Sequence, residues 1–369
     1  MLGHLLTDEV LGERIAGRRC HSNQFSIDHL GMERARIRAI EWASRSEKHD
    51  ASLTASLRTR RPKRDKVHTM KIGVFVGAGT TGLMGIVEAA KLAEEQGFAS
   101  FWTPQVFDGD ALTALALAGQ ATTTIELGTS VLPTYTKHPM AMAEQAMTTN
   151  VAAGGRLCLG LGLSHQMVIE GMYGYSFDKP AIHMREYLTI VQSINSTGSS
   201  AFHGDVFKAY GGFGVVGHKP FGVAIAALAP IMLKLAGTLA DGTITWCTGP
   251  ATLRDHIVPT INAAGESVGK KPRVIAALPV CVTTDKAGAY ERAAKLFEIY
   301  GQLPSYRAML DREGAGIAAD IAITGTMSEV QDRVMALKEI GVTDFGAVEF
   351  GGTPEETHDT REAMRGLLA

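Results

Sequence analysis

A serine–histidine pair stands at the end of an apolar segment in the middle of the chain. The segment RLCLGLGL (156–163) leads directly into Ser164 and His165. An imidazole can donate or accept a proton near neutral pH, so His165 is a candidate catalytic residue. The pair does not indicate a hydrolase, because neighbouring side chains on a strand point apart and no G-x-S-x-G motif is present. A structural role for this lone histidine is the alternative.

A glycine-rich segment, Gly77–Gly82, spells G-x-G-x-x-G between a strand-like and a helix-like stretch. This spacing is typical of dinucleotide-binding loops. Such a loop also needs an acidic residue at the end of the following strand, to bind the ribose. That strand instead ends Trp102-Thr103-Pro104-Gln105. We therefore interpret the glycines as a loop beside a binding pocket.

Two further strand ends carry candidate binding or catalytic residues. Asp108 is a candidate acid, and its alternative role is to cap a helix beginning near residue 111. The segment Ala226–Met232 leads into a helix that starts at Pro230. Backbone amides at the start of that helix, aided by the helix dipole, could bind a phosphate group. Its candidate residues are Ala227, Leu228, Ala229 and Pro230.

The elements that position these residues alternate regularly from Met70 onward. The apolar, β-branched pattern predicts eight strands, at 71–76, 99–103, 124–131, 156–161, 222–227, 242–247, 273–283 and 344–349. Helical segments are predicted between them, at 83–96, 111–122, 139–152, 181–193, 230–239, 251–264, 286–301 and 328–340, with a last helix at 355–368. Eight strands alternating with eight helices indicate an α/β fold, a (β/α)8 TIM barrel, whose carboxyl strand ends meet at one mouth.

Three insertions interrupt this pattern, at 171–180, 198–219 and 303–324. Long insertions in a barrel usually form lids or substrate walls. Trp102, Tyr135 and Phe177 are candidate wall residues, whereas we interpret Trp246 as part of the barrel core.

Motifs in a fixed order identify a family resemblance over roughly Met70 to the C-terminus. GTSVLPTYTKHPMAMAEQA (128–146), GRLCLGLGLSHQ (155–166) and AALAPIMLKLAG (226–237) resemble the luciferase-like flavin and deazaflavin oxidoreductases. The match is most similar to the branch that uses coenzyme F420, an 8-hydroxy-5-deazaflavin. The resemblance implies a TIM-barrel enzyme that carries hydride on this cofactor.

The resemblance also implies roles for individual residues. Ser130-Val131 would form a bulge with a non-prolyl cis peptide against the central ring of the cofactor. Leu163, Ser164 and His165 would line the ring and the ribityl chain. Gln105 aligns with an acid or histidine of the relatives, so this chain departs from the family at the residue expected to handle the proton.

We therefore expect a coenzyme F420-dependent oxidoreductase acting on a small organic substrate. An FMN-dependent monooxygenase on the same barrel is one alternative. A deazaflavin-binding protein without turnover is another, since Gln105 replaces the expected acid.

The composition limits the kinds of molecule that the protein is expected to bind, and a small organic substrate is the expected partner. A net charge of −2 provides no field that would favour nucleic acid or membranes, and no apolar stretch reaches the length of a membrane span. No metal-ligand motif appears. The cysteines Cys158, Cys247 and Cys281 lie in apolar runs typical of buried reduced thiols, which fits the cytoplasm, as does the lack of a signal-peptide pattern. A homodimer is compatible with the sequence.

Residues 1–69 differ from residues 70–369, the expected barrel domain. They hold 14 of the 36 Lys and Arg residues but only 9 of the 38 Asp and Glu residues. This segment could form a short helix near 32–44. It could also serve as an arm that binds nucleic acid or as a helix that binds a partner. Few apolar residues are available to bury a core, so we interpret residues 1–69 as a poorly ordered, non-barrel N-terminal extension.

Overall fold

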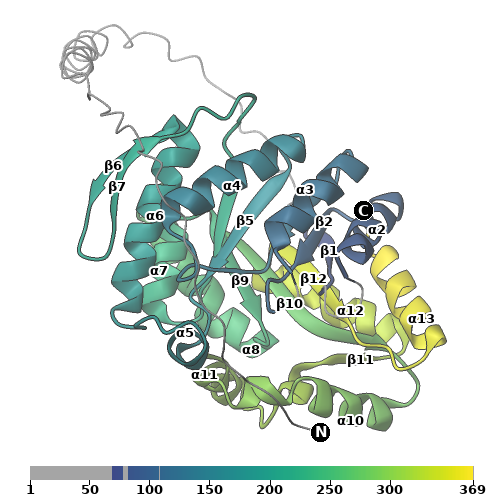
Figure 1. The fold of residues 1–369 in the computed structure, drawn as a ribbon. Coiled ribbons are helices and arrows are strands. Elements are labelled where there is room, and N and C mark those ends of the chain that lie inside the picture. The colour runs from purple at the N-terminus through teal and green to yellow at the C-terminus, as the bar shows by residue number, and fades with distance from the viewer. Residues whose placement is uncertain (1–68, 78–81, 108, 369) are drawn as a thin grey trace, which may run out of the picture. The chain divides into compact units, whose positions relative to one another are not determined.

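A computed structural model describes residues 69–77, 82–107 and 109–368. Eight parallel strands close into a barrel in the order β10-β12-β1-β2-β3-β5-β8-β9, and β9 pairs with β10 to complete the circle (Figure 1). The predicted TIM barrel is therefore confirmed. The strands are β1 (Lys71–Phe75), β2 (Ser100–Thr103), β3 (Glu126–Thr129), β5 (Leu157–Gly162), β8 (Gly222–Ala226), β9 (Gly242–Trp246), β10 (Arg273–Val282) and β12 (Asp344–Glu349).

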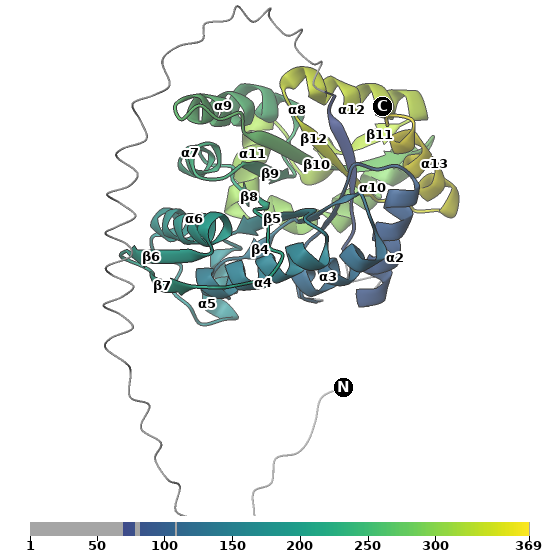
Figure 2. The same ribbon diagram turned by 90° about the horizontal axis from the view of Figure 1, so that it is seen from above.

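Helices surround the barrel and bury their apolar faces against it (Figure 2). The long ones are α2 (Gly82–Glu95), α3 (Ala111–Ala121), α4 (Pro139–Ala152), α6 (Pro180–Thr197), α7 (Pro230–Thr238), α9 (Val258–Glu266), α10 (Lys286–Leu296), α12 (Met327–Ile340) and α13 (Pro354–Arg365). Within the described ranges, none of the helices is both long and apolar enough to span a membrane.

The barrel interior is filled by the indole ring of Trp102, with the ring of Phe75 stacked on it at 5.7 Å. Trp102 is fully buried and forms a cluster with Cys158, Ala224, Ile244 and Ile275. A Cβ atom at Gly128 would lie 2.1 Å from Cε3 of the indole, so only glycine leaves room for this ring. Trp102 is thus core, and its expected role as a pocket wall is wrong.

An ion-pair network closes the opposite mouth, where the strands begin. The guanidinium group of Arg273 pairs with Glu126 (2.6 Å) and with Asp344 (2.7 Å). Asp344 has a side chain only 3% exposed, so the guanidinium group provides its compensating charge. This end of the barrel is therefore sealed, and chemistry is left to the carboxyl ends of the strands.

Two of the three insertions contain regular structure that the sequence did not indicate. Residues 198–219 form an antiparallel hairpin of β6 (Ser199–His203) and β7 (Lys208–Gly212), anchored by the carboxylate of Glu186, which accepts from three backbone N–H groups. The third insertion contains α11 (Pro304–Glu313), the 3₁₀ turn η4 (Ala318–Ile321) and β11 (Ile323–Gly325), which extends the sheet beside β10. The first insertion follows the short helix α5 (Gln166–Gly171).

Three predicted elements are broken in the structure. The strand expected at 124–131 ends at Thr129, and a separate two-residue strand, β4 (Leu132–Pro133), pairs with β5. The helix expected at 251–264 consists of α8 (Pro250–Thr252), a π-helical turn η2 (Leu253–Ile257) and α9. The helix expected at 286–301 ends as α10 at Leu296, and a 3₁₀ turn η3 (Glu298–Gly301) follows.

Several expectations fall outside the described residues. They are the N-terminal extension, its helix near 32–44, Asp108 and most of the glycine-rich loop. The described cysteines, Cys158, Cys247 and Cys281, are buried and free, as expected.

Candidate active site

The carboxyl ends of β3, β5 and β8 lie next to one another at the open mouth of the barrel. Strand register places Leu132 of β4 beside Leu161, and Leu161 beside Ile225 of β8. The segments Ser130-Val131, Leu163–His165 and Ala227–Pro230 follow directly. The structure therefore brings together three of the segments that the sequence nominated.

The end of β3 contains a cis peptide between Ser130 and Val131, which confirms the expected geometry. Both residues are half-buried, and Val131 packs against the cluster inside the barrel. A Cβ atom at Gly162 would lie 2.5 Å from Cγ2 of Val131, so glycine on β5 is what admits the valine. The result is a narrow floor of small and apolar groups at the mouth.

The end of β5 presents Leu163, Ser164 and His165, which are all half-buried. Ser164 adopts a left-handed conformation with φ 60°, which is uncommon for a residue with a side chain. Burial lowers the pKa of His165 below its ordinary value. The imidazole is therefore neutral near pH 7, and one ring nitrogen can accept a proton while the other can donate one.

The end of β8 is held by two side chains that bind its carbonyl oxygens. The Thr243 hydroxyl group lies 3.0 Å from the carbonyl of Ala227, and Nε2 of His256 lies 2.7 Å from the carbonyl of Leu228. His256 belongs to the π-helical turn η2. No side chain caps α7, which begins at Pro230 after the N-cap Ala229. Its first free N–H groups thus remain open to an anion.

The end of β2 is arranged around α3 rather than around an acid. Oε1 of Gln105 accepts a hydrogen bond from the backbone N–H of Ala111 (3.2 Å). The N-cap of α3 is Asp110, whose carboxylate accepts from Thr113 and pairs with Lys137 (2.8 Å). Capping, the alternative role of Asp108, is therefore performed by Asp110.

Six aromatic side chains form an unbroken series of ring contacts at the mouth, which we call the aromatic arc. Its members, in order of contact, are His165, Tyr306, Tyr300, Trp246, Phe297 and Phe350. Neighbouring ring centroids are 5.1 to 5.8 Å apart. Trp246 is half-buried: it packs against the hydrophobic core, as interpreted, and also contributes a ring to this arc.

The arc was missed because its members are distant in the sequence and are joined only by the fold. A signal was available, since Phe297, Tyr300 and Tyr306 are concentrated around the start of the third insertion, just before and after Pro304. Tyr135 and Phe177 form a separate stack (5.2 Å) together with His183 (3.9 Å from Tyr135).

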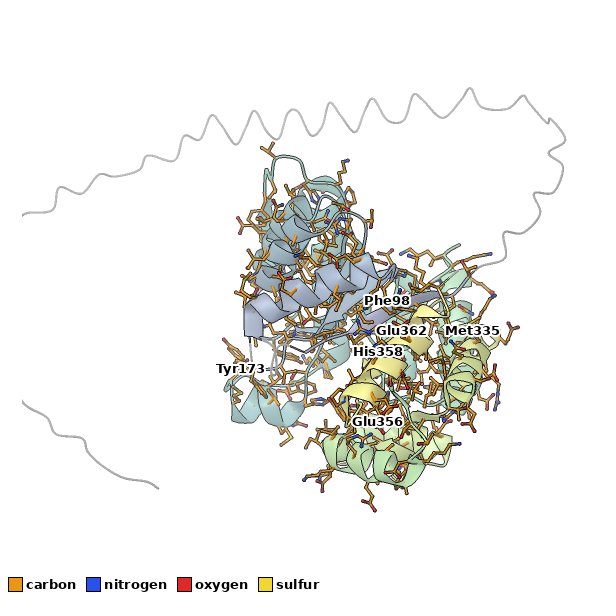
Figure 3. The ribbon with its side chains drawn as sticks, turned by 90° about the vertical axis from the view of Figure 1, so that its right-hand side faces the viewer. Phe98, Tyr173, Met335, Glu356, His358 and Glu362 are labelled. Carbon is orange, nitrogen blue, oxygen red and sulfur yellow. The ribbon has the colours of Figure 1, made fainter. Side chains whose placement is uncertain are left out.

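A separate cavity of about 790 Å³ lies between α2 and α13, on the outside of the barrel. Its lining includes Leu92, His358, Glu362 and Arg361, and the last is engaged with Glu349 at 2.6 Å. Figure 3 shows His358 and Glu362 on α13, well apart from Tyr173, which follows α5. None of the nominated site residues lines this cavity. Elsewhere in the described ranges, no group of three His, Cys, Asp or Glu side chains could hold a metal ion.

Comparison with known proteins agrees with this geometry. The chain is 30% identical to a putative coenzyme F420-dependent oxidoreductase of Mycobacterium tuberculosis, over 75% of this chain and 84% of that protein. It is 27% identical to 5,10-methylenetetrahydromethanopterin reductase of Methanolobus tindarius, over 74% and 84% of the two chains.

A solved structure has the same fold. The coenzyme F420-dependent tetrahydromethanopterin reductase of Methanopyrus kandleri superimposes with a TM-score of 0.67 at 22% identity, covering 80% of this chain and 97% of that one. Residues 67–357 match the family described as luciferase-like monooxygenase. The barrel, its three adjoining strand ends and this match together show that the chain belongs to the luciferase-like monooxygenase family.

Proposed function

We propose that this protein is a coenzyme F420-dependent oxidoreductase that transfers hydride between the deazaflavin and a small organic substrate. The observation that carries the proposal is the meeting of Ser130-Val131, Leu163–His165 and the uncapped start of α7 at one mouth. Relatives whose names include coenzyme F420 support the choice of cofactor.

The residues present fit the flat part of such a cofactor. Ser130 is small, and Val131 and Leu163 offer half-buried apolar surface. The room left by Gly160 and Gly162 is filled by Thr129, Ile244 and Val131, so the end of β5 is packed from within. A planar ring system would therefore rest on the half-buried surface of Ser130, Val131 and Leu163.

The residues also fit the phosphate of the cofactor. Thr243 and His256 bind the carbonyl oxygens of Ala227 and Leu228, which fixes the segment that leads into α7. With no side-chain cap on α7, its N-terminal N–H groups and the helix dipole would favour an anion there.

When bound, a 5-deazaflavin supplies two-electron hydride chemistry. The chain's own residues would hold the ring, exclude water and manage one proton. His165 would donate or accept that proton, because its buried imidazole is neutral near pH 7. Gln105 would contribute no proton, since an amide does not titrate and its oxygen already accepts from Ala111.

Equilibrium titrations of the full chain test the proposal. Coenzyme F420 should bind at least about tenfold more tightly than FMN, which corresponds to about 1.4 kcal/mol. Ser130→Phe should abolish cofactor binding without unfolding the barrel, whereas Ser267→Phe, at an exposed serine after α9, should not. Tighter binding of FMN would support the monooxygenase instead. Tight F420 binding without any hydride transfer would support a carrier.

A further inference from the structure

The aromatic arc crosses half of the barrel mouth. His165 follows β5, Trp246 ends β9, and Phe350 follows β12. The remaining members are carried by the connection from α10 through η3 to α11. Five of the six rings are half-buried and only Phe350 is buried, so the arc forms a wall with an accessible side.

Contacts behind the arc fix its position. The carboxylate of Glu313, at the end of α11, accepts hydrogen bonds from the backbone N–H groups of Ala251 (3.0 Å) and Thr252 (2.6 Å). The Thr252 hydroxyl group donates to the carbonyl of Met309 (3.2 Å). Helix α11 is thereby clamped to the start of α8, and Tyr306 is held in place before any ligand arrives.

The arc contains no permanent charge. His165 is its only titratable member near neutral pH, and burial lowers the pKa of that imidazole. Burial also raises the pKa of the phenols of Tyr300 and Tyr306, so both stay protonated. The wall is therefore neutral at pH 7.

The arginines beside the arc are already paired. The guanidinium group of Arg292 binds Glu356 (2.8 Å) and the carbonyl of Phe350 (3.1 Å). Arg307, next to Tyr306, binds Asp311 and the carbonyl oxygens of Ala315 and Gly316. An anionic substrate would have to break one of these networks to obtain a counter-ion, and the sequence places no basic residue at positions 78–81 or 108.

One donor on the arc lacks a well-placed acceptor. The indole N–H of Trp246 is buried and makes no hydrogen bond of ordinary geometry among the described residues; it has only a weak contact with the Tyr300 hydroxyl group. Buried donors are nearly always paired in folded proteins, so a missing acceptor often marks a ligand position. A carbonyl oxygen on the ligand would satisfy this donor.

We propose that the aromatic arc is the substrate wall of the site, and that it selects flat, uncharged molecules with a carbonyl group and adjacent unsaturation. This inference rests on the proposed function for the identity of the neighbouring cofactor, but the arc itself needs only the side chains named above. Flat rings stack on such a wall, whereas a carboxylate or phosphate would lose hydration there without gaining a partner.

Calorimetric titration with two matched probes tests the inference. Benzylideneacetone is a flat conjugated ketone, and cinnamate carries the same skeleton with a carboxylate in place of the acetyl group. The full chain saturated with coenzyme F420 should bind the ketone at least about tenfold more tightly than cinnamate. Equal or tighter binding of cinnamate would overturn the inference.

Variants locate the binding. Tyr306→Leu and Trp246→Leu should each weaken ketone binding about three- to tenfold, since each removes one aromatic partner. Tyr306→Phe keeps the ring and should bind the ketone nearly as well as the wild type. It is the control for a general effect of substitution at this position. Tyr210→Leu, on the exposed hairpin, is the control and should change nothing. Unchanged ketone binding in both arc variants would refute the inference.

The same titrations without cofactor separate the two proposals. If the protein binds the ketone through Tyr306 and Trp246 but does not bind F420, the role of the arc is supported and the proposed function is refuted. Tight F420 binding, together with ketone binding that is unchanged by substitution of either residue, would support the proposed function and refute the role of the arc.

Discussion

Acid should destabilise the protein through His183, and the structure sets the size of the effect. The side chain is 4% exposed, its Nε2 lies 3.0 Å from Oγ1 of Thr134, and its ring stacks on Tyr135. Burial lowers the pKa of His183 from 6.5 to about 4, against a smaller opposing effect of Glu186. Above pH 6.5 the imidazole is neutral in both the folded and the unfolded chain, so it makes no difference to stability.

As the pH falls from 6.5 to 4, His183 is protonated in the unfolded chain but stays neutral in the folded chain. The free energy of unfolding therefore decreases over this window, by about 2 kcal/mol between pH 7 and pH 5. His183→Phe keeps a ring against Tyr135 but cannot be protonated. It should therefore lose about 2 kcal/mol less than the wild type over the same interval.

Urea unfolding at pH 7, 6 and 5, followed by circular dichroism, measures this difference. His358→Gln, which removes an exposed imidazole from α13, is the control and should follow the wild-type curve. If the His183→Phe curve runs parallel to that of the wild type from pH 7 to pH 5, the imidazole is not buried as described and the reasoning fails.

Three further perturbations have defined outcomes. Arg273→Ala should lower the free energy of unfolding by about 3–5 kcal/mol in urea titrations, because it leaves Glu126 and Asp344 unpaired at the closed mouth; a loss below about 1 kcal/mol would contradict the network. Glu313→Ala should speed hydrogen exchange in α11 and weaken ketone binding. Glu313→Gln can still accept one of the two hydrogen bonds and should show a smaller effect. If the two variants exchange at the same rate, the carboxylate of Glu313 does not clamp α11 to α8. A chain starting at Met70 should fold and bind coenzyme F420 like the full chain, and insoluble protein would contradict that expectation.

The barrel could be predicted because its strands are continuous apolar runs of β-branched and small residues. Such runs are what a parallel sheet buried on both faces requires. The hairpin β6–β7 could not, because each of its strands buries a single residue, Ser200 in one and Ala209 in the other, and no alternating pattern results. Its stability comes instead from Glu186, a contact from another element that no local pattern reveals.

The candidate site also has a part that the sequence predicts and a part that it does not. Ser130, Leu163, Ser164 and His165 could be nominated because they directly follow strands, and strand ends meet at one mouth of a barrel. The part that Trp246 plays at the mouth was missed because the end of β9 fits core and mouth equally well, and its mouth contacts come from Phe297 and Tyr300, which no local pattern links to it. The proton-handling acid could not be assigned, because Gln105 stands at the expected position and Asp108, the nearby candidate, lies outside the described residues.

A crystal structure of the full chain with coenzyme F420 tests the central claim most directly. The account predicts the deazaflavin ring against Ser130-Val131 and Leu163–His165, with the phosphate at the start of α7. The substrate face of the ring should look toward Tyr306 and Trp246. A cofactor bound elsewhere, for example in the cavity between α2 and α13 beside Leu92, would contradict the account.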